Sequence, residues 1–239
     1  MSRLLALFFL VTVVAKPALA QSFSVDMGSD GSLASRSIEI LLLITVLSIV
    51  PGLAVMVTCF PFIVTVLSIL RQALGLQQSP PNMVIVSLAL FLTWFVMDPV
   101  FTEVWLKGVQ PLTEGKIEIQ QAVPLVLAPF RVFLAGRTNP ETYIALQALR
   151  PGEIGAAVDA PLSLLIPSFM LSEISRAFEI GFLIYLPFLI IDLVTAAILM
   201  SMGMMMVPPA VVSLPFKLAF FVVADGWTLI SSALVRSYF

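Results

Sequence analysis

The sequence predicts an all-α, membrane-associated fold built from proline-kinked helical hairpins. Hydrophobic residues fill 60% of the 239 positions and charged residues only 11%, whereas a soluble domain is about half apolar and a quarter charged. The apolar residues gather in four stretches, each long enough to cross a bilayer as a helix. Prolines interrupt these stretches, and a proline inside a helix kinks it.

The composition also excludes several classes of function. The net charge is −2 and no basic cluster is present, so we expect no nucleic acid partner. The chain has a single cysteine, Cys59, and no histidine. An internal disulfide, a zinc or haem site and a serine–histidine–aspartate triad therefore lack their usual residues. We expect no enzyme activity, no metal and no cofactor.

The first 20 residues have the pattern of a secretory signal peptide. Arg3 precedes a short apolar core, and residues 18–20 read Ala-Leu-Ala. The core is too short for a bilayer span, which needs about 20 residues. We expect cleavage between Ala20 and Gln21, which leaves a short external segment at 21–37. The alternative is an uncleaved anchor.

Two helical hairpins are expected on either side of a mixed segment. The first hairpin covers residues 38–106, with apolar stretches at 38–70 and 83–106. The second covers 178–239, with apolar stretches at 178–206 and 210–235. Residues 107–177 are predicted to form an external helical segment. Within it, Asn139 is a predicted N-cap, with Pro140 at the first helical position.

Charges are distributed unusually in this chain. An external start and four crossings place the mixed segment outside. That segment carries six of the ten basic residues that follow the signal peptide, the reverse of the usual bias. Five charged residues also lie within or beside apolar stretches: Asp98, Glu179, Asp192, Lys217 and Asp225. An ionisable group that faces lipid costs on the order of 3 kcal/mol or more. These groups are therefore expected to pair between helices and fix an assembly; the alternative is the ion path of a small-solute or ion transporter.

A methionine-rich segment, "MSMGMMMVPP" (residues 200–209), joins the two stretches of the second hairpin. Five of its first seven residues are methionine. Gly203 allows a bend, and Pro208 and Pro209 prevent the helix from continuing. From composition alone, these methionines are apolar residues tolerated at a helix end.

Several motifs resemble the FliP family of flagellar biosynthesis proteins. In chain order they are "LSILRQALGLQQSPPN", "LALFLTWFVMDPV", "SEISRAFEIGF", "LPFLIIDLV", "SMGMMMVPP", "SLPFKLAFF" and "DGW". The resemblance runs from residue 38 to the C-terminus and is weakest in the mixed segment. One departure is Phe62, where the family usually has arginine, with Pro61 before it. An ion pair made by that arginine in relatives would be absent here.

The resemblance implies a core subunit of the flagellar type III export gate. It implies a bacterial inner membrane protein of the flagellar basal body with a large periplasm-facing part. Five copies of the chain would form a homo-oligomeric helical ring with FliQ and FliR family subunits, and unfolded flagellar proteins would pass through this ring. Met204, Met205 and Met206 would then project into the pore as a flexible apolar gasket.

Overall fold

The computed structural model describes residues 33–76, 79–149, 155–204 and 206–239. These residues form helices and connecting loops without strands. The chain divides into two units, residues 1–47 and 48–239. The signal peptide and its cleavage site, Ala20 and Gln21, lie outside the described residues, so both stay predictions.

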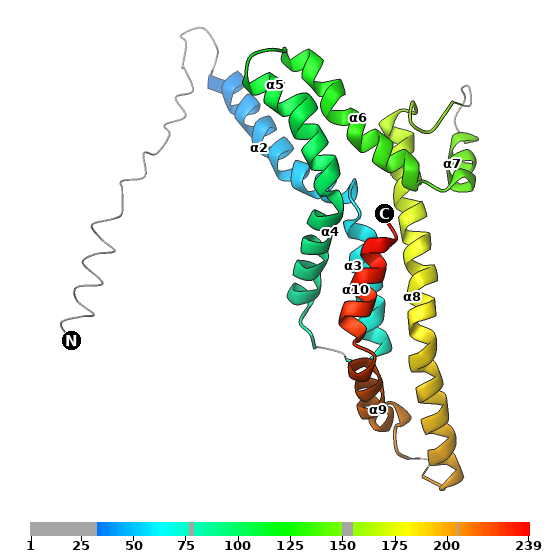
Figure 1. The fold of residues 1–239 in the computed structure, drawn as a ribbon. Coiled ribbons are helices and arrows are strands. Elements are labelled where there is room, and N and C mark those ends of the chain that lie inside the picture. The colour runs from blue at the N-terminus through cyan, green and yellow to red at the C-terminus, as the bar shows by residue number, and fades with distance from the viewer. Residues whose placement is uncertain (1–32, 77–78, 150–154, 205) are drawn as a thin grey trace, which may run out of the picture. The chain divides into compact units, whose positions relative to one another are not determined.

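Ten helical elements follow one another along the described chain (Figure 1). They are α2 (Leu33–Met56), α3 (Phe60–Ala73), α4 (Asn82–Val104), the π-helix η1 (Trp105–Val109), α5 (Gln110–Thr113), α6 (Ile119–Arg137), α7 (Pro140–Gln147), α8 (Leu162–Ser201), α9 (Pro209–Val223) and α10 (Gly226–Arg236). The all-α prediction is confirmed.

In the first unit, the described residues belong to the beginning of α2. The side chains of residues 38–47 are all exposed, and they are almost entirely apolar. The window Ile38–Met56 has a mean hydropathy of 2.5, which fits a helix in contact with lipid or with protein partners rather than with water.

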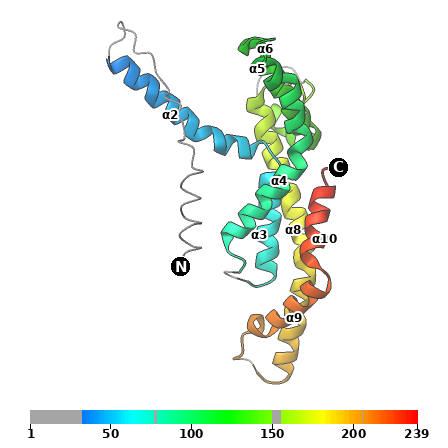
Figure 2. The ribbon, with the colours of Figure 1, turned by 60° about the vertical axis from the view of Figure 1, so that its left-hand side comes forward.

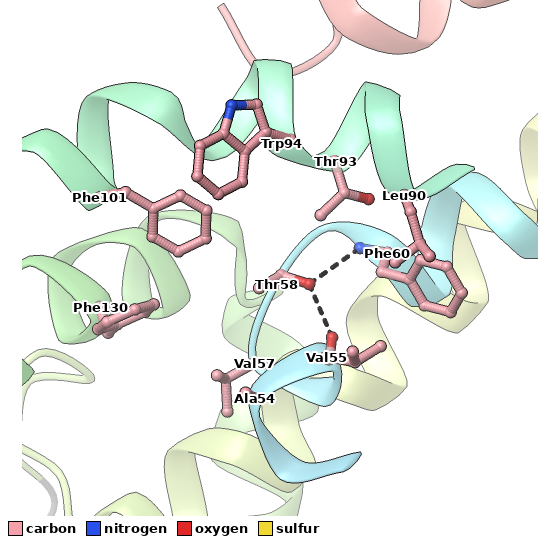
Figure 3. A pocket seen from close by; sticks show the side chains of 10 residues that line it. All are labelled: Ala54, Val55, Val57, Thr58, Phe60, Leu90, Thr93, Trp94, Phe101 and Phe130. Atoms are coloured by element: carbon pink, nitrogen blue, oxygen red, sulfur yellow. Dashed lines mark hydrogen bonds between the residues drawn. The ribbon is translucent and has the colours of Figure 1, made fainter. Parts of the chain in front are cut away.

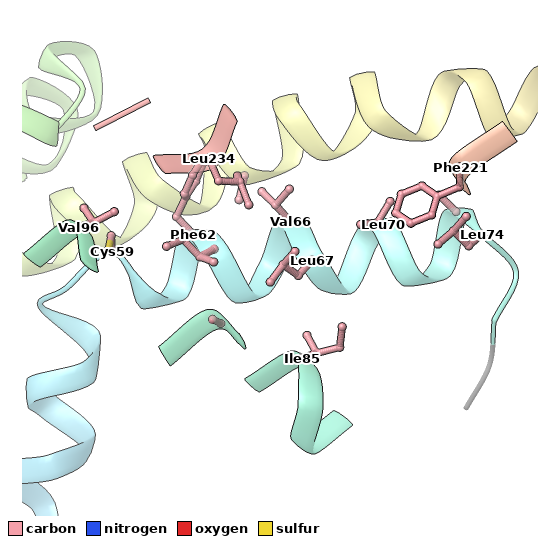
Figure 4. Packing of buried hydrophobic residues seen from close by; sticks show 14 of the residues in the cluster. Cys59, Phe62, Val66, Leu67, Leu70, Leu74, Ile85, Val96, Phe221 and Leu234 are labelled. Carbon is pink, nitrogen blue, oxygen red and sulfur yellow. The ribbon is translucent and has the colours of Figure 1, made fainter. Parts of the chain in front are cut away.

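In the second unit, α3 is the central helix of the core (Figure 4). Its buried side chains follow helical spacing: Phe62, Ile63, Val66, Leu67, Leu70 and Ala73. They pack against α8 on one side and α4 on another, while Phe221 of α9 and Leu234 of α10 complete the cluster. At the crossing with α8, a Cβ on Gly181 would lie 2.4 Å from Ile69 Cδ1, so a larger residue there would require Ile69 or the helices to move.

The longest helix, α8, has 40 residues and runs antiparallel to the α9–α10 pair (Figures 1 and 2). Pro167 and Pro187 lie inside it. Many of its large apolar side chains are exposed. Within the described residues, four helices are long and apolar enough to cross a membrane, or five if the bent pair α9–α10 counts as one span.

The helix boundaries differ from the sequence prediction in three places. The first apolar stretch is broken at 57–59, where the Thr58 hydroxyl donates to Val55 O and accepts from Phe60 N. The helix of the third apolar stretch begins 16 residues before the predicted start at residue 178, because α8 starts at Leu162 and continues through residue 178. The fourth bends by 61° between α9 and α10, where Asp225 adopts a left-handed conformation with φ of 47°.

One detail of the mixed segment is confirmed. Asn139 caps α7 through its side-chain oxygen, which accepts from Glu141 N at 2.8 Å, and Pro140 is the first helical residue. The segment also contains α6, which is apolar enough to span a membrane by length and composition.

Candidate functional site

The methionine loop begins at a well-defined helix end. Gly203 has φ of +74°, and its N–H donates to Met200 O at 3.0 Å. Met204 N donates to Leu199 O, also at 3.0 Å. This pair of hydrogen bonds is a Schellman motif, which satisfies the last carbonyls of α8 and reverses the chain. Pro208 is the N-cap of α9 and Pro209 its first residue, so the three predicted loop-shaping residues define both ends of the loop.

The methionines of this loop differ in exposure. The side chain of Met206 is 97% exposed, whereas Met204 is 43% exposed. Met204 lines an apolar groove of about 490 Å³ between the end of α8 and α9, together with Leu199 and Phe216. Met205 lies outside the described residues. Met206 is therefore free to contact another molecule, while Met204 is partly held by its own hairpin.

An ion pair closes the hairpin behind this loop. Lys217 Nζ lies 2.6 Å from Asp192 Oδ2 and donates to Ala73 O at 3.0 Å. The Ser213 hydroxyl donates to Asp192 Oδ1 at 2.6 Å. The side chain of Lys217 is 6% exposed and that of Asp192 is 29% exposed. A charge of each sign is thus neutralised within the apolar region, and α3, α8 and α9 are joined.

Two of the other predicted charges are placed differently. Asp98 and Asp225 are exposed at the surface of the single chain. Within the described residues, neither carboxylate has an ion pair or a side-chain hydrogen bond. Any burial of these two groups therefore requires another molecule, and their role in assembly stays a prediction.

A second buried ion pair was missed by the sequence analysis. Glu173 in α8 is fully buried, and its Oε1 lies 3.0 Å from Arg137 Nη2 at the end of α6. The Tyr238 hydroxyl donates to Glu173 Oε2, and Arg137 Nη1 donates to Ser237 O at 2.8 Å. These contacts attach the C-terminus of the chain to α6 and α8.

Aromatic rings enclose this ion pair. The Arg137 guanidinium lies 4.0 Å from the centroid of the Tyr238 ring, which stacks on Phe133. Phe62, at the position of the departure from the family pattern, packs edge-on against Tyr238. Burial first, and then the charge of Glu173, raise the pKa of the Tyr238 hydroxyl above its usual value of 10.0. This hydroxyl therefore stays a neutral donor at physiological pH.

A sequence signal exists for the Lys217–Asp192 ion pair and for the Tyr238–Glu173 hydrogen bond. In an antiparallel helical hairpin, residues at equal distance from the turn lie side by side. Asp192 lies 12 residues before Met204 and Lys217 lies 13 after it. Glu173 and Tyr238 lie 31 residues before and 34 after the same methionine. Both contacts are therefore centred on the methionine loop.

An apolar pocket of about 230 Å³ lies where α2 ends and α3 begins (Figure 3). Trp94 and Phe101 of α4 and Phe130 of α6 face Thr58 and Phe60 across it. No charged side chain lines the pocket, so a molecule bound there would be held mainly by apolar contacts.

These features define a class: an all-helical membrane protein whose apolar helices are linked by internal ion pairs and joined by a methionine-rich turn. Residues 43–234 match the FliP family model. The chain is 46% identical to the flagellar biosynthetic protein FliP of Agrobacterium fabrum, over 96% of this chain and 98% of that protein. It is 43% identical to the FliP protein of Bacillus subtilis, over 88% of this chain and 96% of that one. The chain belongs to the FliP family.

Proposed function

We propose that this chain is a core subunit of the flagellar protein export gate in the bacterial inner membrane. Sister copies, together with FliQ and FliR family subunits, form a helical ring through which unfolded flagellar proteins leave the cell interior. Membership of the FliP family supports the flagellar role. The exposed apolar surface of α2, α4 and α8 supports a membrane-embedded assembly.

The methionine loop is the observation that carries the pore function. The Schellman motif at Gly203 and the Lys217–Asp192 pair hold the base of the loop, while Met206 extends freely from it. Methionine is unbranched and polarizable, so a ring of these side chains adapts to varied shapes. Such a ring excludes water and ions when the pore is empty and yields to an unfolded chain when it is occupied.

The test replaces Met204, Met205 and Met206 together with alanine. The complex is expected to assemble in normal yield, because Met206 is almost fully exposed and Met204 is only partly held, within its own hairpin. Membranes that carry it should leak ions, while export of unfolded substrate persists in part. Leucine at the same three positions should keep the seal and narrow the range of substrates, since a branched side chain adapts less.

The control is Met83→Ala at the start of α4, which removes a methionine side chain that is 81% exposed and lies away from the loop. Conductance and purification yield are measured for each complex. An alanine triple variant that assembles normally and leaks no more than Met83→Ala contradicts the gasket. A single chain that transports a small solute in vesicles, and loses this flux when Asp192 is neutralised, would support the transporter alternative.

A further inference from the structure

The methionine loop concentrates oxidisable sulfur in one short part of the chain. Residues 200–206 contain five of the eleven methionines. Oxidation adds an oxygen to the thioether and converts a flexible apolar side chain into a polar one. Reductases reverse this change, so it is a modification that a cell can undo. The position of each sulfur decides which methionine is open to oxidation and what its oxidation changes.

Met206 is the most exposed methionine in the described part of the chain. It is 97% exposed, against 81% for Met83 at the start of α4 and 0% for Met97 in the core. Cys59, the single thiol, is fully buried and does not compete for an oxidant. Hydrogen peroxide is nearly as small as water, so it reaches a sulfur that water reaches. Met206 is therefore expected to react readily, and Met97 to be protected.

Hydrogen peroxide alone is a sufficient oxidant for this step. A lone pair on the Met206 sulfur attacks one peroxide oxygen, so an S–O bond forms and the O–O bond breaks. The departing hydroxide takes the proton that the transferred oxygen still carries, and it leaves as water. The thioether gives two electrons to the peroxide and becomes a sulfoxide. In the reverse direction, a reductase removes the oxygen as water while two of its thiols become a disulfide.

A sulfoxide on Met206 changes the surface of the loop and leaves the core intact. Met206 is almost fully exposed, so its oxidation disturbs little packing within the chain, whereas Met97 belongs to the hydrophobic core. The added oxygen accepts hydrogen bonds from water. An apolar constriction closes a pore by excluding water. A ring of sulfoxides would instead hold water, and with it ions, in a protein that is still folded.

We infer that Met206 is a reversible oxidation site, at which peroxide opens the closed pore to ions and methionine sulfoxide reductases close it again. This inference rests on the proposed pore. A seal across a pore has an aqueous space on each side, and peroxide reaches the loop through that space. The thioether that lets the ring adapt to varied chains thus also makes the ring sensitive to oxidants.

The first test locates the added oxygen. Membranes that carry the full complex are treated with dilute hydrogen peroxide, and peptides of this chain are analysed by mass spectrometry, in which each sulfoxide adds about 16 Da. Met206 and Met83 should both be oxidised, and Met97 should not. Treatment with two reductases, one for each sulfoxide epimer, should remove the added oxygen. An unmodified Met206 beside an oxidised Met83 overturns the inference.

The second test measures conductance before and after the same treatment. The wild-type complex, Met206→Leu and the matched control Met83→Leu are each compared with their own untreated membranes. Conductance of the wild type and of Met83→Leu should rise at least about three-fold and fall back after reduction, because the sulfoxides become apolar thioethers again. Conductance of Met206→Leu should rise far less. An equal rise in Met206→Leu would assign the leak to other oxidised groups of the complex and overturn the inference.

Met206→Gln gives an independent readout without an oxidant. Glutamine is about as long as methionine and carries a polar oxygen, so this variant should assemble and should leak in untreated membranes. A Met206→Gln complex that seals as well as the wild type contradicts the inference. The alanine triple variant separates this inference from the pore itself. If that variant does not leak, the gasket and the oxidation site are both overturned; if it leaks while the peroxide-treated wild type stays sealed, only the oxidation site is overturned.

Discussion

At the scale of single residues, Tyr238 shows how a terminal side chain contributes to the fold. Its hydroxyl donates to the fully buried Glu173, and its ring contacts Arg137, Phe133 and Phe62. Because the pKa of this hydroxyl is raised, the stability of the fold decreases at high pH. Its contribution to stability is complete below the pKa of an unfolded tyrosine, near 10, and is lost as the pH rises through the higher folded value.

Tyr238→Phe is expected to lower the free energy of unfolding by about 1–3 kcal/mol, because a buried carboxylate loses a donor while the ring contacts remain. Thermal unfolding of the purified protein in detergent at neutral pH measures the change. Tyr185→Phe is the matched control, since the Tyr185 hydroxyl has no hydrogen bond among the described residues and its ring is half-buried. Equal effects of the two substitutions would contradict the role assigned to the hydroxyl.

The Lys217–Asp192 pair leads to a second residue-scale prediction. Lys217→Ala leaves Asp192 with Ser213 as its remaining partner. We expect it to lower the free energy of unfolding by about 3 kcal/mol, near the low end for a buried ion pair, because Asp192 is partly exposed. Asp192→Asn should cost less, since an amide still accepts from Lys217. Both should reduce the yield of the complex more than export per assembled complex. Normal yield with abolished export would instead favour a proton path.

At the scale of helices, the α3–α8 crossing depends on a glycine. Gly181→Ala places a methyl group within 2.4 Å of Ile69 Cδ1, so the helices must separate or Ile69 must move. We expect a loss of about 1–3 kcal/mol, typical of overpacking. Gly136→Ala in α6 is the control, because a Cβ there meets nothing within 4 Å and alanine is the better helix former. Thermal unfolding of both variants measures the difference.

The helices also show what a sequence can predict. Asn139 and Pro140 identified the start of α7 because a cap is local chemistry. The start of α8 at Leu162 was missed, because apolar and mixed residues follow one another there without a stop signal. The break at Asp225 was also missed, because residues other than glycine seldom adopt a left-handed conformation and the sequence gives no sign of it here.

For the candidate site as well, the sequence predicted the local features and missed the long-range contacts. Gly203 and the two prolines defined the methionine loop from local rules. The partner of Lys217 required the register of the whole hairpin, and Glu173 was overlooked among the polar and apolar residues of the mixed segment. Long-range pairs of this kind depend on how helices cross, which a single sequence does not state directly.

At the scale of the whole molecule, the N-terminus yields a further prediction. The mature chain is expected to begin at Gln21, because Ala18-Leu19-Ala20 matches the small-residue pattern read by signal peptidase. N-terminal sequencing of protein purified from membranes provides the measurement. A variant with Ala18→Leu and Ala20→Leu should retain its full length. An intact Met1 in the unaltered protein would show an anchor instead.

The length of α8 has a consequence for the surrounding bilayer. Forty residues at 1.5 Å per residue make a helix of about 60 Å, roughly twice the 30 Å hydrocarbon thickness of a membrane. The usual helix tilts, up to about 40°, cannot absorb so large a hydrophobic mismatch. Lipid tails can therefore cover only about half of this helix. Where α8 crosses a bilayer, the rest of the helix projects past the headgroups, and in the proposed assembly sister helices would cover its exposed apolar side chains there.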